Sequence, residues 1–230
     1  IYTIISFMLS LPYFLNTNQS KTINYSLGIM NFTLTTIIYK KHKPNYFKEL
    51  IKDVRIHRLT YYALLITLGT ALAINWPSLN NQQLKKYVLK TILAIITLTL
   101  SWLYSVFSNN LADKEIDKVS NKERPTITKK IKPKHYQQLS NAFLTLSILY
   151  SALINEQAII LNLVYISLYY IYSNPPIRFK KAPIISKIVI SLNSLICIMM
   201  GYVLTETSIN LKPKITIFFL TIITGYMNFI

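Results

Sequence analysis

The run YVLKTILAIITLTLSWLYSVFS (residues 87–108) is long and apolar, with Lys90 as its one charged residue. A helix rises about 1.5 Å per residue, so a run of this length reaches across the ~30 Å hydrocarbon core of a bilayer. It does not sustain the period-2 alternation of polar and apolar residues that a strand of a membrane barrel would require. The stretch therefore predicts a membrane-spanning α-helix.

Seven more runs of sixteen or more residues have little or no charge. They cover residues 1–16, 22–39, 59–75, 137–154, 157–173, 188–204 and 214–230. Several approach the ~20 residues that span a bilayer, and the shorter ones become long enough with their flanking residues. A soluble domain of 230 residues has no need of eight such runs. The sequence predicts an all-α fold, a polytopic transmembrane helix bundle with about eight spans.

The net charge of +17 does not indicate nucleic-acid binding, because the basic residues follow a topological pattern. Nineteen of the 25 Lys and Arg residues lie in every second connection, within residues 40–58, 113–135 and 178–187. Basic residues collect in the cytoplasmic loops of membrane proteins, near anionic lipid headgroups. We therefore expect a multi-pass integral membrane protein with segments 109–135 and 174–187 in the cytoplasm. We also expect 40–58 on that side, membrane lipid as a partner, and no nucleic acid.

Acidic residues are rare in this chain, and half of them lie in one segment. Four of the eight carboxylates fall in SNNLADKEIDKVSNKERP (108–125), at the predicted cytoplasmic end of the fourth run. If the helix continues beyond that run, Asn109, Asp113 and Asp117 recur every four residues and share one face. Oxygen ligands at this spacing suit Mg²⁺, which binds through one or two carboxylates plus substrate phosphates. Arg124 and the flanking lysines could neutralise the remaining charge of a diphosphate.

A solvated, salt-bridged loop is the alternative interpretation, since Lys114, Lys118 and Lys122 alternate with the acids. The position of the acids favours a binding site, because they begin directly at the end of a membrane helix. Asn109 and Asn110 close the apolar run there. Polar groups at that depth usually face a cavity.

The segment NNLADKEID (109–117), followed by Arg124 and Pro125, resembles the first aspartate motif of the UbiA-type membrane prenyltransferases. The family pattern is Asn-Asp-x-x-Asp-x-x-x-Asp, often continuing to Arg-Pro. Asn109, Asp113, Asp117, Arg124 and Pro125 match that pattern. Asn110 departs from it, with an amide where a carboxylate is usual. We expect this change to alter metal affinity before it abolishes the site.

A second segment, YSNPPIRFK (172–180), resembles the Tyr-Ser-x-Pro-Pro-x-Arg-x-Lys stretch that follows the fourth helix of the same family. The two prolines disfavour helix and predict an extended turn. That turn would hold Arg178 and Lys180 near the membrane surface, where a diphosphate would lie. The alternative is that both are plain positive-inside anchors, and Tyr172 taken alone would be an ordinary interfacial aromatic residue.

The resemblance covers about residues 55–230, which corresponds to six of the nine helices of the family fold. The domain prediction is therefore an extra N-terminal transmembrane hairpin with a basic cytoplasmic segment at 1–54, and a partial UbiA-like domain at 55–230. The hairpin could belong to a preceding fused module. The family's second aspartate motif would follow residue 230, so we expect the gene to continue with an Asp-x-x-x-Asp segment and this fragment to be inactive alone.

The resemblance implies transfer of an isoprenyl group from an isoprenyl diphosphate to a small aromatic or alcohol acceptor. The implied Mg²⁺ ligands are Asn109, Asn110, Asp113 and Asp117, of which Asp113 and Asp117 are the catalytic residues. The implied substrate contacts are Arg124, Tyr172, Arg178 and Lys180. The amino-acid sequence of the first motif resembles that of the family branch with archaeal ether-lipid and chlorophyll or tocopherol-type enzymes more than that of the 4-hydroxybenzoate branch.

Two other functions remain open at this point. A CDP-alcohol phosphotransferase also uses aspartates and a diphosphate, but its motif opens with Asp-Gly, and the nearest glycines here are Gly69 and Gly201. A transporter with a cation-binding cytoplasmic rim would tend to place ionisable groups near the membrane midplane, and no carboxylate lies in the middle of a run.

Overall fold

The computed structural model describes residues 20–128 and 130–205, and within these ranges it is helical with no strand. In chain order the elements are α2 (Ser20–His42), α3 (Pro44–Asp53), α4 (Ile56–Ala73), η1 (Trp76–Ser78), α5 (Asn81–Ala112), α6 (Lys114–Ser120), α7 (Pro133–Ile154), α8 (Glu156–Ser173), η2 (Phe179–Lys181) and α9 (Pro183–Tyr202). The predicted all-α class is confirmed. Six of the eight apolar runs coincide with long helices, whereas runs 1–16 and 214–230 lie outside the described residues.

Two of the described helices, α5 and α9, are long and apolar enough by composition to cross a membrane. The other four long helices, α2, α4, α7 and α8, also carry Tyr, Ser, Thr or Asn residues along their length. Many of these polar side chains are satisfied inside the bundle. Ser101 of α5, for example, donates to Asn162 of α8 at 2.6 Å. Lys90, the one charge in run 87–108, is buried and donates to the backbone oxygen of Leu204 at 3.0 Å.

The helix boundaries have local causes in the sequence. Asn80 caps α5 by accepting from the amide of Gln83, and the Gln83 side chain accepts from the amide of Asn80 in return. Asn155 caps α8 in the same way through the amide of Ala158. Proline occupies the first turn of α3, α7 and α9, where its missing N–H costs no helical hydrogen bond.

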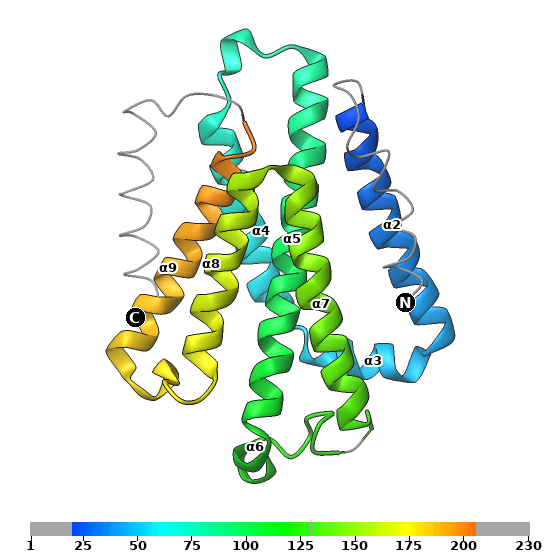
Figure 1. Cartoon of the computed structure of the whole chain (residues 1–230), viewed down its shortest axis with the longest axis vertical. Helices are drawn as coiled ribbons and strands as arrows, with labels where there is room; N and C mark the ends of the chain where they lie inside the picture. The colour runs from blue at the N-terminus through cyan, green and yellow to red at the C-terminus, as the bar shows by residue number, and fades with distance from the viewer. Residues whose placement is uncertain (1–19, 129, 206–230) are drawn as a thin grey trace.

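Helix α5 is the centre of the bundle, and α2, α4, α7 and α8 all pack against it (Figure 1). Helices α4 and α9 approach each other closely where Gly69 and Gly201 bring the two backbones together. A Cβ atom built on Gly69 would lie 2.0 Å from the Ile198 oxygen, and one on Gly201 would lie 1.9 Å from the Ile66 oxygen. Only glycine permits this approach, because any other residue would bring a Cβ atom into the facing backbone. Membrane helices commonly pack closely through small residues in this way.

Three short elements, α3, α6 and η2, lie at one end of the bundle (Figure 1). There α3 lies across the helix ends, α6 continues α5, and the turn after α8 returns to α9 (Figure 1). Leu50 of α3 is buried against Phe107, Ile131 and Tyr136, which holds α3 onto α5 and α7. Because α2 also packs on α5 and α7, the N-terminal segment is in contact with the rest of the bundle. The domain boundary at residue 55 stays a prediction.

Candidate active site

The first acidic motif begins on α5 and continues into α6 with a single non-helical residue, Asp113, between them. Its backbone still follows the helical bonding pattern: the Asp113 amide donates to the Asn109 oxygen at 2.9 Å, and the Asp117 amide to the Asp113 oxygen at 2.8 Å. The predicted continuation of the helix beyond the apolar run is thus confirmed as far as Ala112. Asp113 and Asp117 are both buried.

The second predicted segment forms a turn that is fastened to the end of α5. Asn174 accepts a hydrogen bond from Ser108 at 3.2 Å, and the Arg178 amide donates to the Asn174 oxygen at 3.1 Å. Arg178 has a left-handed backbone with φ of 56°. That conformation costs a non-glycine residue on the order of 1–3 kcal/mol, and such strain is common at functional sites. Here it accompanies a guanidinium that reaches the first motif.

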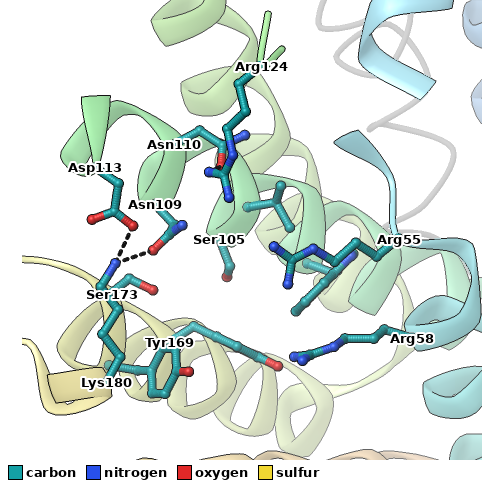
Figure 2. Close-up of a pocket in the computed structure, with 13 residues that line it drawn as sticks. Arg55, Arg58, Ser105, Asn109, Asn110, Asp113, Arg124, Tyr169, Ser173 and Lys180 are labelled. Atoms are coloured by element: carbon teal, nitrogen blue, oxygen red, sulfur yellow. Dashed lines mark hydrogen bonds and ion pairs between the residues drawn. The ribbon is translucent and has the colours of Figure 1, made fainter. Parts of the chain in front are cut away.

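The two segments meet through ion pairs. Arg178 pairs with Asp113 Oδ1. Lys180 pairs with Asp113 Oδ2, and its Nζ also donates to Asn109 Oδ1 at 2.6 Å (Figure 2). Arg124 Nη1 lies 2.9 Å from Asp117 Oδ2. Burial, with nearby Arg178 adding to it, lowers the pKa of Lys180 to about 8. Each predicted carboxylate is therefore neutralised by predicted cations from elsewhere in the chain.

These residues surround a cavity of about 250 Å³. Its lining consists of Arg55, Arg58, Trp102, Ser105, Val106, Asn109, Asn110, Asp113, Arg124, Tyr169, Tyr172, Ser173 and Lys180. Six of the eight predicted site residues are among them. The other two, Asp117 and Arg178, lie behind the lining and contact it through Arg124 and Asp113.

The cavity has two polar walls that differ in charge. Asn109, Asp113 and Lys180 form one, and Arg55 and Arg58 from the start of α4 form the other (Figure 2). In the described part of the chain, no carboxylate forms an ion pair with Arg55 or Arg58. Burial, followed by the charges of Arg58 and Arg124, lowers the pKa of Arg55 from its ordinary value. The charge of Asp53 opposes that shift, so the second wall is a cationic surface that is only partly compensated and has no ion-paired carboxylate among the described residues.

Arg55 and Arg58 were missed by sequence reasoning, which interpreted them as topology signals. The usable signal was their spacing of three residues at the start of a helix, which places both on one face. Trp102 and Tyr169 were also missed. Their rings lie 5.4 Å apart at the cavity, and the Arg58 guanidinium lies 5.8 Å from the Trp102 ring.

Asn110 is held between two residues that do not belong to its own helix. Its side-chain nitrogen donates to the Tyr136 hydroxyl at 2.8 Å, and its oxygen accepts from Arg124 Nη1. The Tyr136 hydroxyl in turn donates to Asp53 Oδ2 at 2.9 Å. Burial raises the pKa of Asp53, and the hydrogen bond from Tyr136 and the charge of Arg124 oppose that effect.

The first wall, with its carboxylate and amide oxygens, fits a hard divalent cation that would be shared with a substrate. Over residues 20–128 and 130–205, no three His, Cys, Asp or Glu side chains converge into a closed cation cage. An open site is what Mg²⁺ uses when one or two carboxylates and substrate phosphates complete its coordination. Asp117 Oδ2 is buried and receives no hydrogen bond from the described residues, although Arg124 is close to it. A bound cation would have to take the place of Arg124 at this oxygen.

Comparison with known proteins gives consistent matches. The family model described as UbiA prenyltransferase family matches residues 63–230. The digeranylgeranylglyceryl phosphate synthase of Sulfurisphaera tokodaii is 27% identical over 147 residues, which are 64% of this chain and 49% of that protein. The chain thus spans about half the length of this curated relative.

Solved structures share the fold. A structure of digeranylgeranylglyceryl phosphate synthase superposes with a TM-score of 0.64 at 20% identity, covering 78% of this chain and 60% of that one. A UbiA homologue from Archaeoglobus fulgidus bound to DMAPP and Mg²⁺ superposes with a TM-score of 0.56 at 23% identity, covering 72% and 58%. Since the family model matches well over half of the sequence, this chain belongs to the UbiA prenyltransferase family.

Proposed function

We propose that this chain carries the diphosphate-binding residues of the active site of a Mg²⁺-dependent prenyltransferase acting on an isoprenyl diphosphate. The observation that supports this best is the pairing of Asp113 with Lys180 and Arg178, and of Asp117 with Arg124. A metal diphosphate contains both signs of charge. It can exchange with these pairs, the metal taking the carboxylates and the phosphate oxygens taking the cations.

The residues of the first wall would then hold the leaving group. Mg²⁺ bound by Asn109, Asp113 and Asp117 would neutralise the charge that develops on the departing diphosphate. Arg124, Arg178 and Lys180 would contact its oxygens, with Tyr172 beside them. Asp113 and Asp117 are buried, and electrostatic contacts are stronger at a buried site than in bulk water.

The chemistry needs no nucleophile from the protein. The allylic carbon–oxygen bond breaks with its electron pair going to the diphosphate, and the acceptor forms the new bond to that carbon. The acceptor's proton ends on the released diphosphate, so the reaction balances. CDP-alcohol phosphotransfer and cation transport, the two alternatives left by the sequence, find no support in the family assignment.

We further propose that the acceptor carries an anionic group. Arg55 and Arg58 face the first wall across the cavity and form no ion pair with a described carboxylate. The relatives named above make a glyceryl phosphate product, whose phosphate is the kind of group that two guanidinium groups bind well. An alcohol acceptor with a phosphate therefore fits the second wall better than an uncharged aromatic one. The charge pattern supports a cytoplasmic location for this end of the bundle.

The test uses membranes that contain the full-length protein. Radiolabelled geranylgeranyl diphosphate is supplied with a prenylated glyceryl phosphate acceptor, with Mg²⁺ or with EDTA. We expect Mg²⁺-dependent formation of the doubly prenylated lipid and its loss in Asp117→Asn. Glu115→Gln is the matched control, because Glu115 lies in the same helix with its side chain 78% exposed and pairs only with Lys118 among the described residues. Turnover in EDTA, or equal turnover in Asp117→Asn, would refute the proposal.

A further inference from the structure

A hydrogen-bonded series of four polar side chains links the end of α3 to the candidate active site. Asp53 lies at the end of α3, Tyr136 near the start of α7, Asn110 near the end of α5, and Arg124 in the connection after α6. The hydrogen bonds run from Asn110 to Tyr136 at 2.8 Å and from Tyr136 to Asp53 at 2.9 Å, and Arg124 donates to Asn110. Tyr136 is fully buried and Asn110 almost fully.

The charged residues at the two ends of this series of side chains fix the direction of every hydrogen bond between them. A carboxylate such as Asp53 only accepts, and a guanidinium such as Arg124 only donates. The Tyr136 proton must therefore point to Asp53, which leaves the phenol oxygen to accept from Asn110. The amide of Asn110 has one donating and one accepting end, so it satisfies Tyr136 and Arg124 at the same time.

A carboxylate at position 110 could not replace the amide in this surrounding. It has no N–H for Tyr136, and the single phenol proton would lie between two buried carboxylates. Like charges at such separation repel strongly in a site shielded from water. The departure of Asn110 from the family pattern is thus matched to the presence of Asp53.

We propose that Asp53 and Tyr136 are positioning residues that act through Asn110 to hold Arg124 against the diphosphate site, and that Asn110 and Asp53 form a matched amide–carboxylate pair. This inference rests on the proposed function for the role of Arg124. It gives Asn110 a role other than that of metal ligand. It also connects α3 to catalysis, because Asp53 is the last residue of that helix.

The packing around the series supports a positioning role. The Tyr136 ring stacks on Phe107 with ring centroids 4.3 Å apart, so its hydroxyl has little freedom. Leu50 seats α3 in the same apolar cluster, one turn before Asp53. Arg124 contacts both Asn110 and Asp117 and lines the cavity. A shift of the Asn110 amide would therefore change the position of Arg124 at the cavity wall.

The test is a charge exchange in the whole gene product. Asn110→Asp should raise the KM for geranylgeranyl diphosphate about tenfold or more. This is the scale for losing a well-made hydrogen bond between a charged group such as Arg124 and the diphosphate. Asp53→Asn combined with Asn110→Asp keeps the number of carboxylates and reverses the direction of the hydrogen bonds in the series. The new amide at position 53 would donate to Tyr136, and Tyr136 would donate to the new carboxylate at position 110. The double variant should recover to within about threefold of the unaltered protein.

The control for this exchange is Glu49→Gln, which also removes a carboxylate from α3. It should leave KM unchanged, because Glu49 pairs only with Lys52 and Lys130 in the described structure. Two further measurements separate positioning from simple folding. In an Arg124→Gln background, Asn110→Asp should have no further effect on KM, because the residue through which it acts is absent. The Tm of the purified proteins should fall in Asn110→Asp and recover in the double variant, a readout independent of catalysis.

Three outcomes would overturn the inference. They are a single Asn110→Asp variant with equal activity and a lower Mg²⁺ requirement, a double variant no better than the single one, and recovery of Tm without recovery of KM. Absence of prenyl transfer in the unaltered protein would instead refute the proposed function and the positioning role together, while the Tm comparison would still decide the matched pair.

Discussion

Replacement of Lys180 by Gln is the sharpest test of the diphosphate wall. Lys180 Nζ donates to Asn109 Oδ1 at 2.6 Å and pairs with Asp113, while its side chain is 19% exposed. A charge-assisted hydrogen bond in such a place contributes about 1.5–3 kcal/mol. Gln keeps one donor but removes the charge, so we take about 2 kcal/mol, which corresponds to about 30-fold in affinity.

The kinetic signature follows from which substrate the side chain contacts. The KM for geranylgeranyl diphosphate should rise by about 30-fold, and the KM for the acceptor should stay within about threefold. Lys181→Gln is the matched control, since Lys181 is the adjacent residue, is exposed and does not line the cavity. Steady-state assays with each substrate varied in turn measure both constants. Equal rises in the two KM values would refute the assignment and leave Lys180 as a topological anchor.

Three further predictions concern the rest of the molecule. Arg55→Gln or Arg58→Gln should raise the KM for a phosphate-bearing acceptor about tenfold and leave that for the diphosphate unchanged, and the opposite pattern would contradict the second wall. Gly69→Ala should lower the stability of the bundle by about 3 kcal/mol or more, because its Cβ would lie 2.0 Å from a backbone oxygen; an unchanged Tm would show that α4 and α9 are not so close. A single cysteine at Lys132 should be labelled from the cytoplasmic side and one at Ser78 from the other side, and the reverse would overturn the charge-based topology.

The sequence was informative where spacing alone determines geometry. Asn109, Asp113 and Asp117 share one side because four residues make about one helical turn, and the structure keeps that pattern through the short break at Asp113. The turn around Arg178 was predictable from the two prolines. The meeting of this turn with Asp113 followed from the family resemblance, since nothing local in either segment specifies the other.

The residues that were missed depend on contacts between distant segments. Tyr136 and Asp53 are separated by 83 residues, so the hydrogen bond between them leaves no local pattern in the sequence. Arg55 and Arg58 are indistinguishable by composition from the other basic residues of segment 40–58, and only the fold brings them to the cavity. Asn110 could be recognised as a departure from a motif, but its reason lies in partners on α7 and in the connection after α6.

The ion pairs of the free site predict how metal and substrate bind. Mg²⁺ alone would have to displace Lys180 and Arg178 from Asp113, which would leave two largely buried cations without a carboxylate partner. A diphosphate alone would draw the cations away and leave the buried carboxylate uncompensated. Either loss is costly in a site of low exposure, so the two ligands should bind with positive coupling, each raising the affinity for the other by the same factor.

Removal of one cation should therefore have opposite effects on the two binding reactions. Lys180→Gln relieves Mg²⁺ of a competitor for Asp113, so the affinity for Mg²⁺ alone should rise, by about threefold to tenfold, while the affinity for the Mg²⁺–diphosphate complex falls. Calorimetric titration of the purified protein, first with MgCl₂ and then with geranylgeranyl diphosphate at saturating Mg²⁺, measures both. Lys181→Gln should change neither affinity. A variant in which both affinities fall would show that Lys180 supports the metal site directly, and that charge partners are not exchanged when the ligands bind.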